Sequence, residues 1–200
     1  MRMRTITLCM VLIACSVAAS PQMPMGGAET GPKAGTMLSP SKAVDSQVSL
    51  IESEMMGAVK AMPAEKFGFA PSATIFAPGQ TTEFATVRTF AQQATHVAQA
   101  NYFFYMAASG LKPDVDVASI EKLTGKDDVV AALAGSFAFA HKAVATLTAS
   151  NALTVVQIQE PGIYTRATLS EFGVAHAFDH YGQMVEYLRM NGIVPPASAK

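Results

Sequence analysis

Four histidines carry the clearest chemical signal in this sequence, and two of them have a spacing suited to metal binding. His176 and His180 are four residues apart, so on an α-helix they lie on one face, about 6 Å apart along the axis. Neutral imidazole nitrogens are common ligands of zinc and related ions, and two at this spacing can both reach one ion. Such pairs also arise on helices by chance. The spacing therefore predicts a metal site only if another segment supplies a further ligand.

His96 supplies that ligand if its segment packs against the segment of His176 and His180. It lies in the middle of a stretch with helical apolar periodicity, on a strip beside the apolar face. Three imidazoles from two helices leave one or more coordination positions for water or substrate, as in catalytic rather than structural zinc sites. His141 lies near the apolar face of a different segment, and we interpret it as a buried histidine hydrogen-bonded to a neighbour.

Three other side chains near the histidines are candidates for moving a proton or orienting a ligand. Glu171 and Asp179 could each accept a hydrogen bond from an imidazole or act as a general base. Simpler interpretations are a helix cap for Glu171 and a solvated surface acid for Asp179, and Tyr181 is a candidate for handling a proton. The sequence has no glycine-rich phosphate loop, G-x-S-x-G or H-E-x-x-H motif, so no catalytic residue is assigned.

Apolar residues recur every three or four positions in four segments, which predicts four α-helices over about 41–62, 86–109, 126–147 and 168–191. Pro63 ends the first helix, and Gly110 is the expected residue after the end of the second. The segments 124–127 and 168–171 resemble capping boxes, so we expect the third and fourth helices to begin there. The predicted stripes are Val44, Val48, Ile51, Met55, Val59 and Met62; Phe90, Ala94, Val97, Asn101, Phe104 and Ala108; Val130, Leu133, Phe137, Val144 and Leu147; and Val174, Phe178, Tyr181, Val185 and Leu188.

The connections between these helices are long. Residues 63–85 contain three prolines and two glycines, and we expect a crossover loop there that Phe67, Phe69 and Phe76 attach to the helices. Residues 154–158 could form a strand but have no clear pairing partner in the sequence. These features predict an all-α fold, namely an antiparallel four-helix bundle with a long crossover loop after the first helix.

The first 19 residues have the layout of a secretory signal peptide. Arg2 and Arg4 precede an apolar run of about ten residues, which is too short to span a bilayer at roughly 20 residues, and small residues at 17–20 favour cleavage after Ala19. Alternatively, residues 12–15 resemble a lipobox, in which case cleavage precedes Cys15 and a lipid anchors the chain there. We therefore predict a periplasmic or extracellular protein without a transmembrane helix in the mature chain.

After the leader, residues 20–40 are rich in proline, glycine and small side chains and predict a flexible spacer. Residues 41–197 then form the helical domain. Both cysteines, Cys9 and Cys15, lie in the leader, so this domain has neither a disulfide nor a cysteine ligand. An apolar share of 50% excludes disorder of the whole chain, and a net charge of −1 without a basic cluster excludes nucleic-acid binding as the main task.

Three stretches resemble proteins of the DinB-like superfamily. They are 61–71 (AMPAEKFGFAP), 89–103 (TFAQQATHVAQANYF) and 176–189 (HAFDHYGQMVEYLR), the last followed by NGIVPP at 191–196. The resemblance covers about 44–197 and is specific in order and spacing rather than in any single motif. It implies an antiparallel four-helix bundle with a metal triad, one histidine on the second helix and H-x-x-x-H on the fourth. By position these ligands are His96, His176 and His180.

The resemblance implies less about the reaction. Some relatives resemble thiol-dependent transferases or isomerases in which a metal activates the thiol, and homodimers are common among them. We therefore expect a divalent transition ion, zinc or nickel by its preference for imidazole, in a hydrolase or thiol transferase that acts on an unknown small molecule. The alternative is a non-catalytic metal-binding bundle, or a structural or stress-response helical protein.

Overall fold

The computed structural model describes residues 31–75, 77–80, 83–84 and 87–199. The predicted signal peptide with both cysteines, the first part of the predicted spacer and Phe76 lie outside these residues. The chain divides into two units, 1–36 and 37–200. In the first unit, the described residues form a turn in which the Thr36 amide donates to the Lys33 carbonyl at 3.0 Å. Among the described residues, all helices and strands belong to the second unit.

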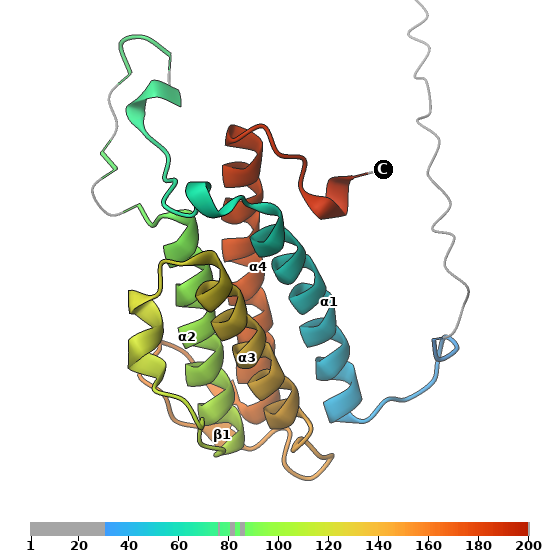
Figure 1. The fold of residues 1–200 in the computed structure, drawn as a ribbon. Helices are drawn as coiled ribbons and strands as arrows, with labels where there is room; N and C mark the ends of the chain where they lie inside the picture. The colour runs from blue at the N-terminus through green and yellow to red at the C-terminus, as the bar shows by residue number, and fades with distance from the viewer. Residues whose placement is uncertain (1–30, 76, 81–82, 85–86, 200) are drawn as a thin grey trace, which may run out of the picture. The chain divides into compact units, whose positions relative to one another are not determined.

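The described part of the second unit is mostly helical and has only two short strands, which confirms the predicted all-α class (Figure 1). Its long helices are α1 (Pro40–Ala61), α2 (Phe90–Ser109), α3 (Lys126–Val144) and α4 (Arg166–Met190). Short 3₁₀ helices lie in the connections and at the C-terminus: η1 (Ala64–Lys66), η2 (Ala73–Ile75), η3 (Val117–Lys122) and η4 (Pro196–Ser198). Two short strands, β1 (Val155–Val156) and β2 (Tyr164–Thr165), pair antiparallel just before α4.

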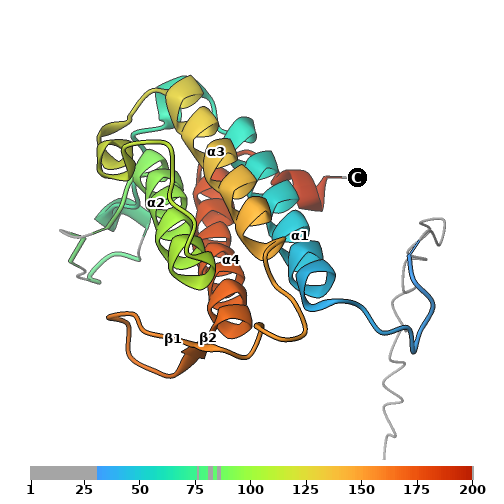
Figure 2. The ribbon, with the colours of Figure 1, turned by 90° about the horizontal axis from the view of Figure 1, so that it is seen from below.

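The four long helices lie side by side, and each packs against two others (Figures 1 and 2). α2 contacts α3 and α4, and α1 contacts α4 and α3. Tyr105 near the end of α2 donates to the carbonyl of Ser170 at the start of α4, so these two helices run in opposite directions. His141 near the end of α3 reaches Asp45 at the start of α1, so this pair is also antiparallel. Lys66, just after α1, donates to the carbonyl of Asn191, just after α4, so α1 and α4 run the same way, and so therefore do α2 and α3.

The connection that crosses the length of the helices lies between α2 and α3, whereas the prediction placed it after the first helix. Because α2 and α3 are parallel, residues 110–125 must return along their full length. They carry η3, which packs along α2 and whose Val117 carbonyl accepts from the Gln99 side chain at 3.1 Å. The segment after α1, although long, joins helix ends at one end of the molecule, since the Phe90 amide donates to the Phe69 carbonyl at 2.8 Å.

Two of the three phenylalanines expected to attach that segment do so. Phe67 is buried and packs edge-on against Phe90, with ring centroids 5.4 Å apart. Phe69 packs edge-on against Tyr187 of α4 at 5.6 Å. The Ala91 amide also donates to the Phe67 carbonyl at 2.9 Å. These contacts fix the start of α2 and, through it, the position of the first turns that precede His96.

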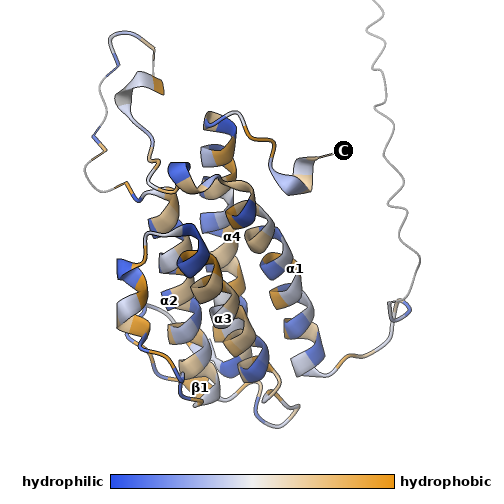
Figure 3. Cartoon of the chain, viewed as in Figure 1, coloured by the Kyte–Doolittle hydropathy of each residue, from blue (hydrophilic) through white to orange (hydrophobic). Residues whose placement is uncertain are grey.

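The apolar stripes predicted for α1 and α2 are buried throughout, and Figure 3 shows hydrophobic and hydrophilic positions on each long helix. The stripe predicted for α4 is only partly correct, because Phe178, Tyr181 and Val185 are half-buried. α4 packs against both α1 and α2. Its face toward α2 consists largely of small or polar residues, which the prediction missed because it considered only large apolar side chains. The buried residues of α4 are Leu169, Ser170, Gly173, Val174, Ala177, His180, Met184, Tyr187 and Leu188.

The two predicted capping boxes are wrong. α3 is preceded by Gly125, whose lack of a side chain leaves no capping hydrogen bond, and Asp127 and Asp128 lie in its first turn, where acids favour the helix dipole. α4 begins at Arg166, slightly before the predicted start at 168, because strand β2 leads directly into the cap at Thr165, which forms a box with Thr168. α2 begins at Phe90 behind a box formed by Thr89 and Gln92, rather than near position 86.

Residues 154–158 do have a pairing partner, contrary to the prediction. Val155 pairs with Thr165 and Val156 with Tyr164, so the hairpin closes the connection between α3 and α4. Its loop, 157–163, carries Glu160 towards the helices of the histidine cluster, where it lines a cavity with His96 and His176. Among the described helices, none is long and apolar enough to cross a bilayer.

Candidate metal centre

The close packing of α2 against α4 places the candidate ligands. Gly173 of α4 lies against the Tyr105 ring of α2, so closely that a Cβ at this position would stand 3.2 Å from the ring atoms. The Tyr105 hydroxyl donates to the Ser170 carbonyl at 3.2 Å across the same interface. Because His176 and His180 follow Gly173 along one side of α4, this approach brings their rings to the face of α2 that carries His96.

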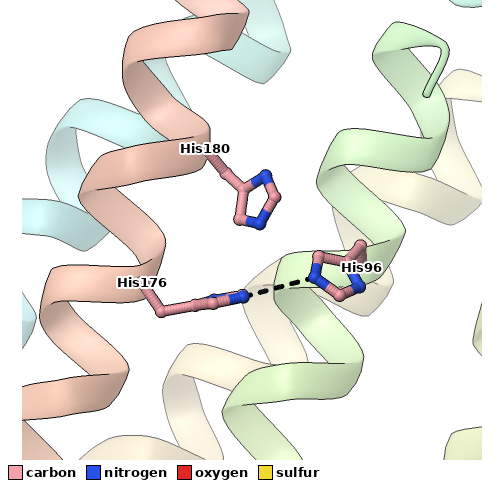
Figure 4. Close-up of side chains that lie close together, drawn as sticks. All are labelled: His96, His176 and His180. Carbon is pink, nitrogen blue, oxygen red and sulfur yellow. Dashed lines mark hydrogen bonds between the residues drawn. The ribbon is translucent and has the colours of Figure 1, made fainter. Parts of the chain in front are cut away.

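The three predicted histidines come together between these two helices (Figure 4). One ring nitrogen from each of His96, His176 and His180 lies within 4.8 Å of the others. The Nε2 atoms of His96 and His176 are 3.2 Å apart. Two nitrogens that bind one zinc ion tetrahedrally at about 2.0–2.1 Å lie roughly 3.3 Å apart. The separation of these two nitrogens therefore matches that of two ligands of a single ion.

A chain of side-chain amides orients His180. Its Nδ1 lies 2.6 Å from Gln93 Oε1, and since an amide oxygen only accepts, Nδ1 carries the proton and Nε2 keeps its lone pair. The Gln93 amide nitrogen donates to Gln183 at 2.8 Å, and Gln183 donates to Asp179 at 3.2 Å. Gln93 is only 2% exposed, so its amide has little freedom to turn. The arrangement presents the ligand nitrogen of His180 to the other histidines.

His176 is held differently. Its Nδ1 is buried and has no hydrogen-bond partner among the described residues. The ring packs edge-on against Phe104, with centroids 5.5 Å apart, and its remaining nitrogen faces His96. A buried imidazole nitrogen without a partner raises the free energy of the folded chain. In this structure the ring is therefore held by its packing on Phe104 and by the contact of its Nε2 with His96 Nε2, and not through Nδ1.

All three imidazoles favour the neutral form, which is the form that binds metals. Burial lowers the pKa of His96 to about 4 and that of His180 to about 4, and it also lowers the pKa of His176. The positive charge of Arg88 lowers all three pKa values further. At neutral pH the cluster therefore offers lone pairs and carries no charge of its own.

Two cavities reach the cluster from the surface and meet at His96 and Gln99. The first has a volume of about 640 Å³ and is lined by polar side chains that include Arg88, Gln92 and Glu121. The second, of about 560 Å³, reaches both His96 and His176 and has walls made chiefly by Phe103, Phe104 and Phe172. Cavities of this size accommodate small molecules. His96 is therefore accessible from both cavities and His176 from the second, whereas His180 is buried.

His141, the histidine excluded from the predicted site, lies apart from the cluster and is hydrogen-bonded to neighbours as predicted, although it is half-buried rather than buried. Its Nδ1 is 2.6 Å from Asp45 and its Nε2 is 3.0 Å from Glu52, both on α1. These two carboxylates raise its pKa despite the opposing effect of burial. With both ring nitrogens engaged, His141 joins α3 to α1.

The three proton-transfer candidates do not touch the cluster directly. Asp179 is exposed and connects to His180 only through the amides of Gln183 and Gln93. Glu171 is exposed and is not the cap of α4. The Tyr181 hydroxyl donates to Glu54 of α1 at 2.6 Å, a contact between α1 and α4.

Sequence reasoning missed Gln93, the residue that orients His180. Gln93 precedes His96 by three positions and so lies on the same side of α2, and it is a polar residue beside a buried stripe. That position was a usable signal, whereas its contact with a helix more than 80 residues away was not visible in the sequence. Arg88 and Glu160 were missed for the same reason, since each reaches the site from a connecting segment.

Fold and site together define a helical protein in which two packed helices bring three neutral histidines to the meeting point of two cavities. The model of the DinB superfamily matches residues 47–184. The chain belongs to this superfamily, as its resemblance predicts. A comparison with curated proteins finds no match. The matched range contains His96, His176 and His180, so the whole cluster lies within the part of the chain that matches the superfamily.

Proposed function

We propose that this chain is a metal-dependent enzyme in which His96, His176 and His180 hold one divalent transition ion, zinc or nickel. The observation that carries the proposal is the meeting of three imidazole nitrogens within 4.8 Å of one another, at the point where two cavities open. We further infer that α1–α4 form the four-helix bundle of the superfamily and that the chain is exported through its predicted leader. These inferences place the site between the second and fourth helices of the bundle.

The donor set fits such an ion in three respects. The cluster contains only imidazoles, which suit zinc and nickel. Two of its nitrogens already have the separation that one ion requires, and the third ring is oriented by Gln93 through its other nitrogen, as ligating histidines commonly are. The unpartnered Nδ1 of His176 departs from this pattern. His176 therefore contributes a less strongly oriented ligand than His180.

A divalent ion at this position supplies Lewis acidity, which lowers the pKa of a water or thiol bound to it. The chain's own residues supply the surroundings. The cavities admit the substrate, the phenylalanines give the second cavity an apolar wall, and Gln93 keeps the lone pair of His180 directed at the site. Hydrolysis and thiol transfer on a small molecule both suit this arrangement. The two cavities favour an enzyme over a non-catalytic metal carrier, because a storage or structural site has no use for them.

Elemental analysis of the untagged chain tests the proposal, since a histidine tag would itself bind metal. After incubation with zinc or nickel and removal of excess ion, we expect about one ion per chain. The variant His96→Ala/His176→Ala/His180→Ala should bind none while keeping its far-ultraviolet circular dichroism spectrum, because it removes every proposed ligand.

His141→Gln is the matched control, since it also removes a histidine from a helix but leaves the cluster intact. It should bind the same amount of metal as the unaltered chain. Absence of metal from the unaltered chain, or equal binding by the triple variant, would refute the proposal.

A further inference from the structure

Two cavities of different chemical character meet at the cluster, and their difference carries information about the substrate. The cavity beside His176, here called the aromatic chamber, is lined by Ala100, Phe103, Phe104, Val117 and Phe172, together with Gln99 and Glu160. The cavity on the other side of His96, here called the arginine chamber, contains Arg88, Gln92, Thr95 and Glu121. A substrate that extends from one chamber to the other passes His96.

The aromatic chamber is suited to an apolar group. Phe104 packs edge-on against Phe172, with centroids 5.1 Å apart, and against Phe103 at 5.4 Å. The Phe103 side chain is nevertheless 39% exposed, so apolar surface stands open at the chamber wall. Burying a phenyl-sized group against such a wall is favourable by roughly 25 cal/mol per Å² of apolar area removed from water. A flat aromatic or branched apolar group fits this chamber.

The arginine chamber is suited to an anionic group. Arg88 lines it together with His96, from a position just before α2. A guanidinium binds a carboxylate or phosphate with two charge-assisted hydrogen bonds. Each chamber also carries one exposed acid, Glu121 or Glu160, so an ammonium group is the competing choice. Arg88 is exposed like the two acids, and we favour the anion because a guanidinium holds a carboxylate or phosphate with two parallel hydrogen bonds, whereas a single carboxylate offers an ammonium group no such paired geometry.

We propose that the substrate is a small amphiphilic anion, with its apolar group in the aromatic chamber and its carboxylate or phosphate at Arg88. The bond to be altered then lies beside His96, between the two chambers. This inference rests on the proposed function, because it assigns the cluster as the reacting centre. It adds that Arg88 and Phe103 select the substrate, each from a different side.

Isothermal titration calorimetry on the zinc-loaded chain tests the inference with 3-phenylpropionate as probe. Propionate lacks the apolar group, 3-phenylpropanol lacks the charge, and 3-phenylpropylammonium reverses it. We expect 3-phenylpropionate to bind at least about tenfold more tightly than each of the other three, since it alone satisfies both chambers. Equal binding of propionate and 3-phenylpropionate, or tighter binding of the ammonium probe, would overturn the inference.

Two variants separate the chambers. Arg88→Gln should weaken 3-phenylpropionate about tenfold and leave 3-phenylpropanol unchanged, whereas Phe103→Ser should weaken both phenyl probes. The matched controls are Arg189→Gln, an exposed arginine near the end of α4, and Met106→Ser, an exposed apolar residue of α2 that does not line either cavity. Neither control should alter binding. Unchanged binding of 3-phenylpropionate by Arg88→Gln would refute the role of this residue.

The same titrations on the metal-free chain distinguish the two proposals. The chambers are formed by the protein alone, so the preference for 3-phenylpropionate and its dependence on Arg88 should persist without zinc, although binding weakens. If the chain binds no zinc but keeps this preference, the proposed metal centre is refuted and the assignment of an amphiphilic anion as ligand stands. A chain that binds zinc but shows no preference refutes the ligand class alone.

Discussion

At the scale of single residues, Gln93 determines how His180 can act. The Gln93 amide oxygen accepts a hydrogen bond from His180 Nδ1–H, and its amide nitrogen donates one to Gln183, so both ends of the amide are engaged. It thereby selects the tautomer that leaves Nε2 free for an ion. Residues that orient a metal ligand in this way commonly contribute ten- to a hundredfold to metal affinity. Gln93 is therefore the first residue outside the three histidines that we expect to affect the centre.

Gln93→Leu should lower the zinc affinity by about ten- to a hundredfold, because His180 loses the acceptor that sets its tautomer and ring orientation. Gln183→Leu is the matched control, since it removes a hydrogen bond one step further from the metal and should have a smaller effect. Competition with a chromophoric chelator measures both affinities. The assignment of Gln93 fails if the two variants lose the same amount, or if Gln93→Leu binds zinc as well as the unaltered chain.

At the scale of elements, the distance between α2 and α4 sets the geometry of the cluster. Gly173 permits this distance, because any larger side chain would meet the ring of Tyr105. The capping boxes at Thr89 and Thr165 fix where the two helices begin, and so decide which turn of α2 faces which turn of α4. The two antiparallel helices thus place histidines 80 positions apart in the sequence beside each other.

Glycine-to-alanine substitutions at two positions of α4 test whether the close approach of α2 and α4 is needed for the cluster. Gly173→Ala should destabilise the fold by about 1–3 kcal/mol, because the added methyl meets a packed ring and forces the helices apart, and zinc affinity should fall with it. Gly182→Ala has open space at its Cβ, so it should stabilise the fold by about 0.5–1 kcal/mol through higher helix propensity. Urea unfolding and zinc titration of both variants provide the comparison. Identical effects of the two substitutions would contradict the role of the close approach.

At the scale of the whole molecule, two sets of histidines respond to pH in opposite directions. The cluster histidines have pKa values lowered by burial, to about 4 for His96 and His180. The carboxylates of Asp45 and Glu52 raise the pKa of His141. In the unfolded chain all of these histidines titrate near 6.5. The folded state therefore takes up fewer protons than the unfolded state at the cluster and more at His141.

The free energy of unfolding of the metal-free chain should reflect both sets. Between pH 6.5 and about 4 the unfolded chain protonates its cluster histidines while the folded chain does not. The free energy of unfolding should therefore decrease as the pH is lowered through this range, by on the order of 1–3 kcal/mol. The triple alanine variant should lack most of this loss. Above pH 6.5 the contribution of His141 should disappear as pH rises through its raised pKa, and His141→Gln should lack that change. Urea titrations at pH 8, 6.5 and 4.5 measure both windows, and a triple variant with the same acid sensitivity as the unaltered chain would contradict the first.

Apolar periodicity was sufficient to predict the helical class, the existence of the four long helices and the buried stripes of α1 and α2, because amphipathic helices bury one face whatever their partners are. The spacing of His176 and His180 was likewise local information, and His96 could be added because the chain resembles its superfamily. The caps of α3 and α4 were wrong, since a glycine precedes α3 and a strand leads into α4, and α4 consequently begins earlier than predicted. Local patterns therefore predicted the elements better than their ends.

Tertiary structure alone decided what surrounds the histidines. The direction of each helix, the contact of Gln93 with His180, the partners of His141 and the approach of Arg88 and Glu160 all join residues far apart in the sequence. Such contacts depend on which helix faces mutually pack, and no local pattern records this. The sequence by itself determined that three histidines lie on two amphipathic helices. Packing across Gly173 and Tyr105 decided that they meet, because only the distance between the helices turns three separate side chains into one site.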